Sequence, residues 1–544
     1  MSKNITFLRS YGLTVLNNWK ENLYLLSLLA VIIALPTSIA LLSGLAFALP
    51  VIWIITGDYK EKWNRLLHNR NALLIMSIPF LYLIALFFTH NFSVGFQELN
   101  KSLYWFIFAF FISSSPPVSY KNACRLLSIY ITVVSIAAGV ALYKLFLIDT
   151  IFLSDFRKVT WVDHIPFSCQ IAFTIWLIFY FIIKENFSWV QKLLLLLLIS
   201  FLIIALVFLK SFTAYIFFGV MSFTALCMLI GKTRIKLLKI IFSGLTILII
   251  VLPVFYLKHC VKNFYNITEY NADEIELYTA NGNKYKHDFN DKTKENGNYV
   301  SLFICNEELI PLWNAHSNKQ YDSKTSAGYP LSSVIIRYMT SKGLKKDAEG
   351  FAQLTQKDIE NIENELTNYI YAEKKFIVYS RIYETVWELD VYRNTKNPNG
   401  KSLPERVEQA ILALDIIKKH VWFGIGLGNN AGAYDEVILE TGSKLSHQEQ
   451  GWTHNQYFNY LIRFGIIGTL YIFGVLVYVF IKGRKNNPFL LTLFFVSMLA
   501  ANFGEANWET FVGINFFAFF FCFLMWVTPK DIIENKTLIS AESP

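Results

Sequence analysis

Long apolar segments recur along this chain and restrict its fold more than any other feature. A helix of about 20 apolar residues crosses the hydrocarbon core of a bilayer and satisfies its own backbone hydrogen bonds there. Composition agrees, because 54% of the residues are hydrophobic and only 16% are charged. A soluble domain carries about a quarter charged residues. The sequence therefore predicts an all-α polytopic membrane protein.

The apolar segments predict about 12 transmembrane helices. Their expected limits are 22–38, 40–56, 71–89, 102–116, 122–147, 166–183, 190–209, 212–230, 237–256, 455–481, 487–504 and 511–528. The first two belong to one apolar run, and its breaks at Pro36 and at Ser43-Gly44 predict a tight helical hairpin. The apolar segment after residue 21 is too long for a signal-peptide core, so we expect it to remain as an anchor.

Basic residues are distributed unevenly between the connections. Connections on one side of the predicted topology carry clusters, such as the one at 60–70, whereas the short loops opposite hold only Lys101, Arg157, Lys158 and Lys210. The positive-inside rule then places both termini in the cytoplasm and the long segment 257–453 outside. Because the charges follow topology, the net charge of +9 does not predict nucleic-acid binding.

Four parts follow from this topology. We expect a nine-span N-terminal membrane domain (1–256), a large outer loop domain (257–453), a three-span C-terminal membrane domain (454–529) and a cytoplasmic tail (530–544). The loop is expected to be mixed α+β. "ELYTANGNKYKH" predicts a hairpin around Asn281-Gly282, "NYVSLFICNEELIPLW" predicts a short strand and turn, and helical patterns follow. Whether Cys260 and Cys305 form a disulfide stays open.

Three glycines in "GIGLGNN" (424–430) suggest two interpretations. A nucleotide-binding loop would follow a strand and continue into Gly-Lys-Ser/Thr, and neither feature is present. We therefore expect these glycines to end the preceding helix and to let the chain turn closely against a neighbour.

The stretch "WTHNQYF" (452–458) places a histidine where a span begins. Thr453 and Gln456 match a capping box, which predicts Thr453 as the N-cap and His454 and Asn455 as the first two helical residues. The positive end of the helix dipole disfavours imidazolium, so His454 is expected to be neutral and able to act as a general base. The alternative is an interfacial histidine without a catalytic role, which residue type alone favours.

Several cations are expected on the same outer face as His454. They are Arg157, Lys158, Lys210, Arg381 and Arg406. Arg406 falls in the first turn of its helix, where a cation opposes the dipole unless an anion is near. Each has a local alternative: Arg406 can pair with Glu405 or Glu408, Arg381 with Glu384, and Lys210 can extend to the interface. Together with the histidine they predict a site for a lipid phosphate or pyrophosphate.

The stretch "RVEQAILALDIIKKHVWFGIGLGNN…THNQYFNYLIRFGIIGTLYIF" resembles the O-antigen ligase/polymerase family of bacterial inner-membrane proteins. The resemblance consists of an Arg-led helix, a glycine turn and a His-Asn pair opening a span with a Gly-Ile-Ile-Gly patch. It extends over roughly residues 120 to 480, including the span count and the large loop before the tenth span. The loop stretch "YPLSSVIIRYMTSKG" looks like a Bacteroidota-type variant.

This resemblance implies a metal-independent glycosyltransferase of the GT-C type, without a cofactor and with a periplasmic loop. It would transfer a glycan from an undecaprenyl-pyrophosphate carrier to an acceptor. Carried over by position, His454 activates the acceptor hydroxyl, supported by Thr453, Asn455 and Gln456. The pyrophosphate would be bound by Arg406 and the loop cations Arg157 and Lys158, with Lys210 and Arg381 as further candidates.

One departure from the family pattern concerns the eighth span. The family often has Ser-Arg near its start, whereas here Ser211 is followed by Phe212. Whether Lys210 replaces that charge stays open.

The resemblance leaves three acceptors open: lipid A-core, as in lipopolysaccharide biosynthesis, another lipid-linked glycan (a polymerase), or a periplasmic protein (an O-oligosaccharyltransferase). An alternative from a different class is a transporter or flippase for polyprenyl-linked glycans. A transporter should place ionisable groups near the bilayer midplane. Here the cations are expected at the outer surface, which favours transfer chemistry over transport and over a structural scaffold.

Overall fold

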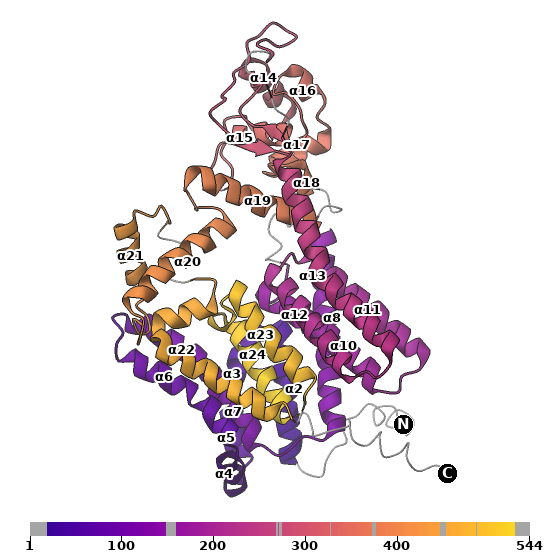
Figure 1. The fold of residues 1–544 in the computed structure, drawn as a ribbon, viewed down its shortest axis with the longest axis vertical. Helices are drawn as coiled ribbons and strands as arrows, with labels where there is room; N and C mark the ends of the chain where they lie inside the picture. The colour runs from indigo at the N-terminus through magenta and orange to yellow at the C-terminus, as the bar shows by residue number, and fades with distance from the viewer. Residues whose placement is uncertain are drawn as a thin grey trace. The chain divides into compact units, whose positions relative to one another are not determined.

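A computed structural model describes residues 19–147, 159–267, 270, 275–326, 328–372, 377–446, 453–485 and 487–527. These residues form two compact units (Figure 1). The first, here called the membrane unit, lies within 19–143, 159–247 and 405–527. The second, here called the loop unit, lies within 144–147 and 248–404. Each unit is described by itself.

The predicted spans and the segments that connect them in the membrane unit are almost entirely helical. The helical elements are α2 (Trp19–Thr37), α3 (Ile39–Ile55), α4 (Tyr59–His68), α5 (Arg70–Met76), α6 (Ile78–Leu86), α7 (Phe92–Ser114), α8 (Tyr120–Leu147), α10 (His164–Lys184), α11 (Trp189–Phe208), α12 (Phe212–Lys232), α13 (Lys236–Tyr265), α20 (Ser402–Lys419), α21 (Asn430–Thr441), α22 (Gln456–Gly483), α23 (Leu490–Gly504), the 3-10 turn η4 (Asn507–Glu509) and α24 (Phe511–Trp526). Each predicted span coincides with one of these helices, or with the pair α5–α6 for 71–89.

Length and composition alone qualify seven of the described helices as membrane spans: α2, α8, α10, α11, α12, α13 and α22. An eighth is obtained if α3 and α4, which bend by 117° at their break, count as one span. Three shorter apolar helices cover 70–86, α23 and α24. The prediction of an all-α polytopic membrane protein is therefore confirmed.

The membrane unit has an aromatic core built around the two C-terminal helices. Helices α23 and α24, yellow in Figure 1, pack against α7, α10 and α12 from the first half of the chain. The ring of Phe173 on α10 lies 5.0 Å from that of Phe494 and 4.9 Å from that of Phe520. Between lipid-embedded helices, such close packing replaces the hydrophobic driving force that operates in water.

The two ends of α7 carry different chemistry. At its C-terminal end, Arg65 Nε donates to the Ser114 carbonyl at 2.8 Å, and Lys20 pairs with Asp58 at 2.7 Å in the same region. Near its N-terminal end, Glu98 accepts from the Gly428 amide at 3.0 Å. The basic cluster at 60–70 and the glycine turn therefore lie at opposite ends of this helix.

Helix α22 is interrupted at Gly465, whose φ is 60° and ψ is −167°. The backbone groups released there bond to the glycine turn and to the residues just before it. Ile425 N donates to the Ile462 carbonyl at 2.8 Å, and Ile466 N donates to the Val421 carbonyl at 2.8 Å. An unsatisfied backbone group in lipid costs several kcal/mol. These hydrogen bonds avoid that cost and so allow the helix to break within a membrane. The prediction that "GIGLGNN" turns closely against a neighbour is confirmed.

Alanine at Gly465 is expected to destabilise the fold by more than about 1 kcal/mol. Its Cβ would lie 2.3 Å from the Trp422 carbonyl carbon, and its φ is in the left-handed region. Gly474, later in the same helix, has no atom within 4 Å of an added Cβ and is the matched control. Thermal unfolding of the two variants in detergent should show a lower midpoint for Gly465→Ala alone. Equal midpoints would contradict the close crossing at the break.

The loop unit combines short helices with very little sheet. Its elements include α14 (Asn306–His316), α15 (Leu331–Ser341), α16 (Ala348–Ala352), α17 (Gln356–Glu363), α18 (Tyr369–Ala372), α19 (Ile377–Thr395) and an antiparallel pair β1 (Lys294–Glu295) and β2 (Asn298–Tyr299). The hairpin predicted around Asn281-Gly282 is present, with Tyr278 bridged to Lys284 and Gly282 at φ 82°.

The expectation of a strand and turn in "NYVSLFICNEELIPLW" is only half right. Its start forms β2, but residues 306–316 form α14. Two reasons favour the helix: Glu307 and Glu308 lie in the first turn, where acidic residues complement the dipole, and Leu309 and Trp313 are buried with helical i, i+4 spacing.

Polar contacts also hold the loop unit together. Glu295 is fully buried and accepts two hydrogen bonds from Arg337, at 2.8 and 2.6 Å, and one from Asn368 at 2.7 Å. Cys260 and Cys305 are both buried and both free, so the structure holds no disulfide between them.

Candidate functional site

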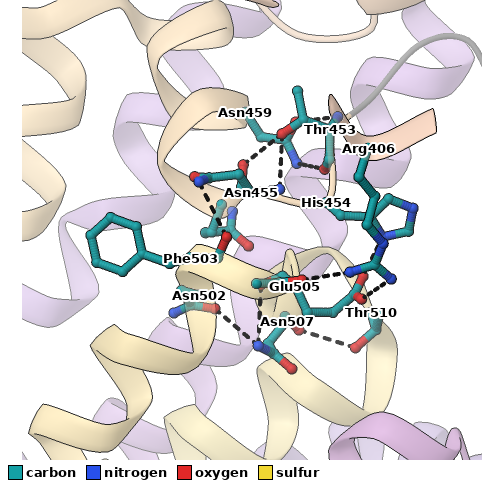
Figure 2. A network of polar contacts seen from close by, with 12 residues as sticks. Arg406, Thr453, His454, Asn455, Asn459, Asn502, Phe503, Glu505, Asn507 and Thr510 are labelled. Carbon is teal, nitrogen blue, oxygen red and sulfur yellow. Dashed lines mark hydrogen bonds and ion pairs between the residues drawn. The ribbon is translucent and has the colours of Figure 1, made fainter. Parts of the chain in front are cut away.

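Three segments that are far apart in the sequence meet at one buried carboxylate. His454 Nδ1 lies 2.7 Å from Glu505 Oε1, and Arg406 Nη2 lies 3.0 Å from Glu505 Oε2. Arg406 Nη1 also donates to the Gly504 carbonyl at 2.7 Å. Figure 2 shows the side chains of Arg406 and His454 reaching the same residue from different elements. Arg406 belongs to α20, His454 precedes α22, and Glu505 follows α23.

The local structure around His454 differs from the predicted capping box. Helix α22 begins at Gln456, and its N-cap is Asn455, whose side chain accepts from the amides of Tyr457 at 2.9 Å and Phe458 at 3.2 Å. The prediction of Thr453 as the N-cap is wrong. Asn and Thr both cap helices well, but the backbone of Thr453 is bound by Asn459, which accepts from its amide and donates to its carbonyl, both at 3.0 Å.

Gln456 also has a role other than the predicted one. Its Nε2 donates to Glu509 Oε1 at 2.9 Å, and its Oε1 accepts from the Trp508 amide at 3.0 Å. It therefore binds the α23–α24 connection rather than completing a capping box. His454 precedes the N-cap of α22 and lies outside the first helical turn, so the contact with Glu505, rather than the helix start, sets the orientation of its ring.

Glu505 remains ionised although it is buried. Burial alone would raise the pKa of this carboxyl, but the hydrogen bond and charge of His454, together with Arg406, hold the pKa below its usual range. An ionised carboxylate only accepts hydrogen bonds, so the proton in the contact lies on His454 Nδ1. In the neutral ring Nε2 is then the unprotonated nitrogen. The His454 side chain is 28% exposed, so a substrate can reach it.

The lowered pKa of Glu505 predicts how stability depends on pH. A carboxyl whose pKa is lower in the folded chain stabilises the fold above its unfolded pKa, about 4.3, and loses this effect as pH falls through the folded value. Glu505→Gln should therefore lower the thermal midpoint at pH 7, and the deficit should shrink below about pH 4.3. The midpoints of both proteins across a pH series provide the measurement. A deficit that grows on acidification would contradict the assignment.

A second charged cluster lies beside this site and is almost fully buried. Arg463 Nη1 donates to Glu509 Oε1 at 2.6 Å, and its Nη2 lies 2.7 Å from Glu98 Oε1. The exposed fractions of Arg463, Glu98 and Glu509 are 3, 7 and 6%. Neither these residues nor Glu505 were among the site residues predicted from the sequence. One signal was available, because an arginine inside a predicted span marks a functional position by default.

The other predicted cations have different positions. Arg157 and Lys158 lie outside the described residues. Lys210 lies between α11 and α12 in the left-handed region, with φ 51°. The start of α12 lies at the Glu505 end of α23, because Thr213 Oγ1 is 3.6 Å from a Cβ built on Gly504. Arg381 belongs to the loop unit and pairs with Glu384 at 2.5 Å, as its local alternative predicted.

Among the residues that the structure describes, no group of three or more His, Cys, Asp and Glu side chains is arranged to hold a metal ion.

Comparison with known proteins agrees with the predicted resemblance. Residues 368–473 match the family model described as O-antigen ligase. The matched segment includes Arg406, the glycine turn and His454, whereas Glu505 lies beyond it. No curated protein matches the chain. The Arg-led helix, the glycine turn and the His-Asn pair all lie inside this matched segment, and it is in this segment that the chain is similar to the O-antigen ligase family.

Proposed function

We propose that this protein transfers a glycan from an undecaprenyl-pyrophosphate carrier to an acceptor at the periplasmic face of a bacterial inner membrane. The family match supports glycan transfer of the O-antigen ligase kind in general. The observation that carries the finer proposal is the convergence of His454 and Arg406 on Glu505. This convergence supports a mechanism in which a base and a fixed positive charge act beside each other, as the reaction requires.

His454 is proposed as the general base. Its Nδ1–H donates to Glu505 at 2.7 Å, which orients the ring and leaves Nε2 to accept a proton. The acceptor hydroxyl attacks the anomeric carbon of the donor glycan and gives its proton to Nε2. The new glycosidic bond forms as the bond from the anomeric carbon to the pyrophosphate oxygen breaks, and undecaprenyl pyrophosphate leaves. Glu505 stabilises the resulting imidazolium.

Arg406 is proposed to bind the pyrophosphate and to stabilise the charge that develops as it leaves. A guanidinium has five N–H donors, and Arg406 uses one for the Gly504 carbonyl and one for Glu505. Preorganised donors of this kind act on developing charge without reorganising. Lys210 is proposed as a second cation because its connection lies at the same end of α23. Arg157, Lys158 and Arg381 stay as predictions from the sequence.

The direction of the protein in the membrane is also a proposal. The basic cluster around Arg65 lies at the opposite end of α7 from the elements that hold Arg463 and the glycine turn. The positive-inside rule assigns that cluster to the cytoplasm and the His454 end to the periplasm. Both termini would then be cytoplasmic and the loop unit periplasmic.

Transfer can be tested with purified protein in nanodiscs. Undecaprenyl-pyrophosphate glycan is supplied with lipid A-core, a second lipid-linked glycan or a periplasmic protein, each in a separate reaction. We expect one acceptor to be glycosylated, with one undecaprenyl pyrophosphate released per bond formed. EDTA should leave the rate unchanged, since the proposal needs no metal. Movement of the lipid-linked glycan across sealed vesicles without any product would favour the transporter alternative and overturn the proposal.

Arg406→Ala tests the donor side of the site. We expect the transfer rate to fall by about 10²- to 10³-fold, as when a preorganised donor to a developing anion is removed. Lys418→Ala is the matched control on the same helix, because its side chain is 74% exposed and pairs only locally, with Asp415. Equal rates for the two variants would remove Arg406 from the proposed mechanism.

A further inference from the structure

The first part of α22 is a separate segment rather than the start of one continuous helix. Residues 456–464 lie between the Asn455 cap and the break at Gly465. At the break, Gly426 N donates to the Arg463 carbonyl at 3.0 Å, so the glycine turn holds that end. The orientation of this segment is therefore not dictated by the rest of the span and depends on its own contacts.

Side chains of this segment bind one short connection. Gln456 and Arg463 are seven residues apart, which is about two helical turns and places them on one face. Both reach Glu509 Oε1, Gln456 at 2.9 Å and Arg463 at 2.6 Å. Arg463 also binds Glu98 on α7, whose other oxygen accepts from the Gly428 amide. The cluster of Arg463, Glu98 and Glu509 thus joins four elements.

The same two elements carry the His454–Glu505 contact. His454 is two residues before Gln456, and Glu505 is four residues before Glu509. The connection between the two carboxylates is tightly bonded, since Asn507 N donates to the Glu505 carbonyl at 2.9 Å and Glu509 N to the Ala506 carbonyl at 3.0 Å. Figure 2 shows Glu505 of this connection pointing toward His454 and Arg406, whereas Asn507 donates to Asn502. Movement of 456–464 against η4 would therefore separate His454 from Glu505.

A purely structural role explains this cluster less well. Buried ion pairs add little net stability, because desolvation offsets their attraction. Aromatic contacts already pack the segment, with Tyr82 4.7 Å from Phe464 and Trp508 5.8 Å from Tyr460 between ring centroids. Such contacts tolerate sliding, whereas hydrogen bonds from a planar guanidinium to two carboxylates are directional. The cluster therefore fixes the position of the 456–464 segment rather than adding stability through buried apolar surface.

We propose that Arg463, held by Glu509 and Glu98, is a positioning residue for glycan transfer: it fixes the 456–464 segment against the α23–α24 connection, so that His454 and Glu505 meet at hydrogen-bond distance. This inference rests on the proposed function.

Two conservative variants test the proposal in the nanodisc assay. Glu509→Gln removes the charge but keeps the shape of the side chain. Arg463→Lys keeps the charge but loses the planar guanidinium that donates to two carboxylates at once. We expect kcat per folded enzyme to fall by about 10- to 100-fold in each, as for a displacement of about 1 Å, with KM for the donor changed by less than about twofold. Asp58→Asn, which breaks the Lys20–Asp58 pair in the same unit, is the control and should leave kcat unchanged.

A double-mutant cycle separates positioning from general damage. If the cluster acts through His454, adding Glu509→Gln to His454→Ala should cause no further loss of the residual rate. If it acts independently, the two losses should multiply, and the proposal is overturned. It is also overturned if both single variants keep wild-type kcat, or if neither can be recovered folded, since the cluster would then be a determinant of folding.

Failure of this inference can be told from failure of the proposed function. If wild-type protein shows no transfer, or His454→Ala transfers at the wild-type rate, the proposed function fails first. If transfer depends on His454 but not on Glu509 or Arg463, only the positioning inference fails.

Discussion

Replacement of His454 by alanine is expected to reduce the rate of glycan transfer by about 10²- to 10⁴-fold, the usual contribution of a general base. The acceptor hydroxyl would then have no group to take its proton at the site where Glu505 orients the ring. KM for the donor should change little, because in the proposed mechanism His454 contacts the acceptor rather than the pyrophosphate. The measurement is kcat with the acceptor identified in nanodiscs, normalised to folded protein.

His420→Ala is the matched control for this variant. His420 is an exposed histidine directly after α20, within the same matched domain, and does not contact Glu505. It should retain the wild-type rate. Full activity of His454→Ala at normal expression would end the general-base role and return this residue to an interfacial histidine.

Glu505→Gln is expected to reduce the transfer rate by at least about 10²-fold, because a carboxylate that orients a histidine contributes this much or more in hydrolytic triads. The amide removes the negative charge that supports an imidazolium, and it no longer selects the tautomer with the proton on Nδ1. Arg406 loses its ion pair in the same substitution. Both halves of the proposed mechanism are therefore weakened at once.

The measurement for Glu505→Gln is kcat together with its pH profile, compared with Glu440→Gln as a control. Glu440 is half-exposed on α21 and pairs with Lys419 at 2.7 Å, so its loss should leave the rate unchanged. Glu505→Asp should fall between wild type and Glu505→Gln, because it keeps the charge but shortens the reach. A wild-type rate for Glu505→Gln would make the contact with His454 purely structural.

Part of the site could be predicted from residues that are close in the sequence. The helix with Arg406, the glycine turn and the His-Asn pair lie within about 50 residues, and each has a local signal. The prediction that Arg406 needs an anion was correct in its physics, but the anion is Glu505 rather than a neighbour on the same helix. Glu505 is 51 residues from His454, and no local pattern links the two.

The error at Thr453 shows where local patterns stop being sufficient. A capping box requires both side chains to turn back onto the helix start. Here Gln456 finds Glu509 and Trp508 on another element, and Asn459 takes the backbone of Thr453. Where a side chain has two possible hydrogen-bond partners, tertiary packing decides which one it binds. A short sequence pattern carries no information about that packing.

The sequence by itself determined the class of fold and the order of its helices, because lipid leaves a long apolar segment only one way to satisfy its backbone. It also predicted a close turn at the glycines of 424–428, because glycine adopts a left-handed backbone without steric cost. The positive φ of Gly424, Gly426 and Gly428 agrees with that prediction. Only the tertiary structure decided which charges meet. Glu505, Glu509 and Glu98 come from different elements, and a buried charge is stable only where an opposite charge arrives beside it. That meeting depends on how the helices pack, so the partners of His454, Arg406 and Arg463 became visible only in three dimensions.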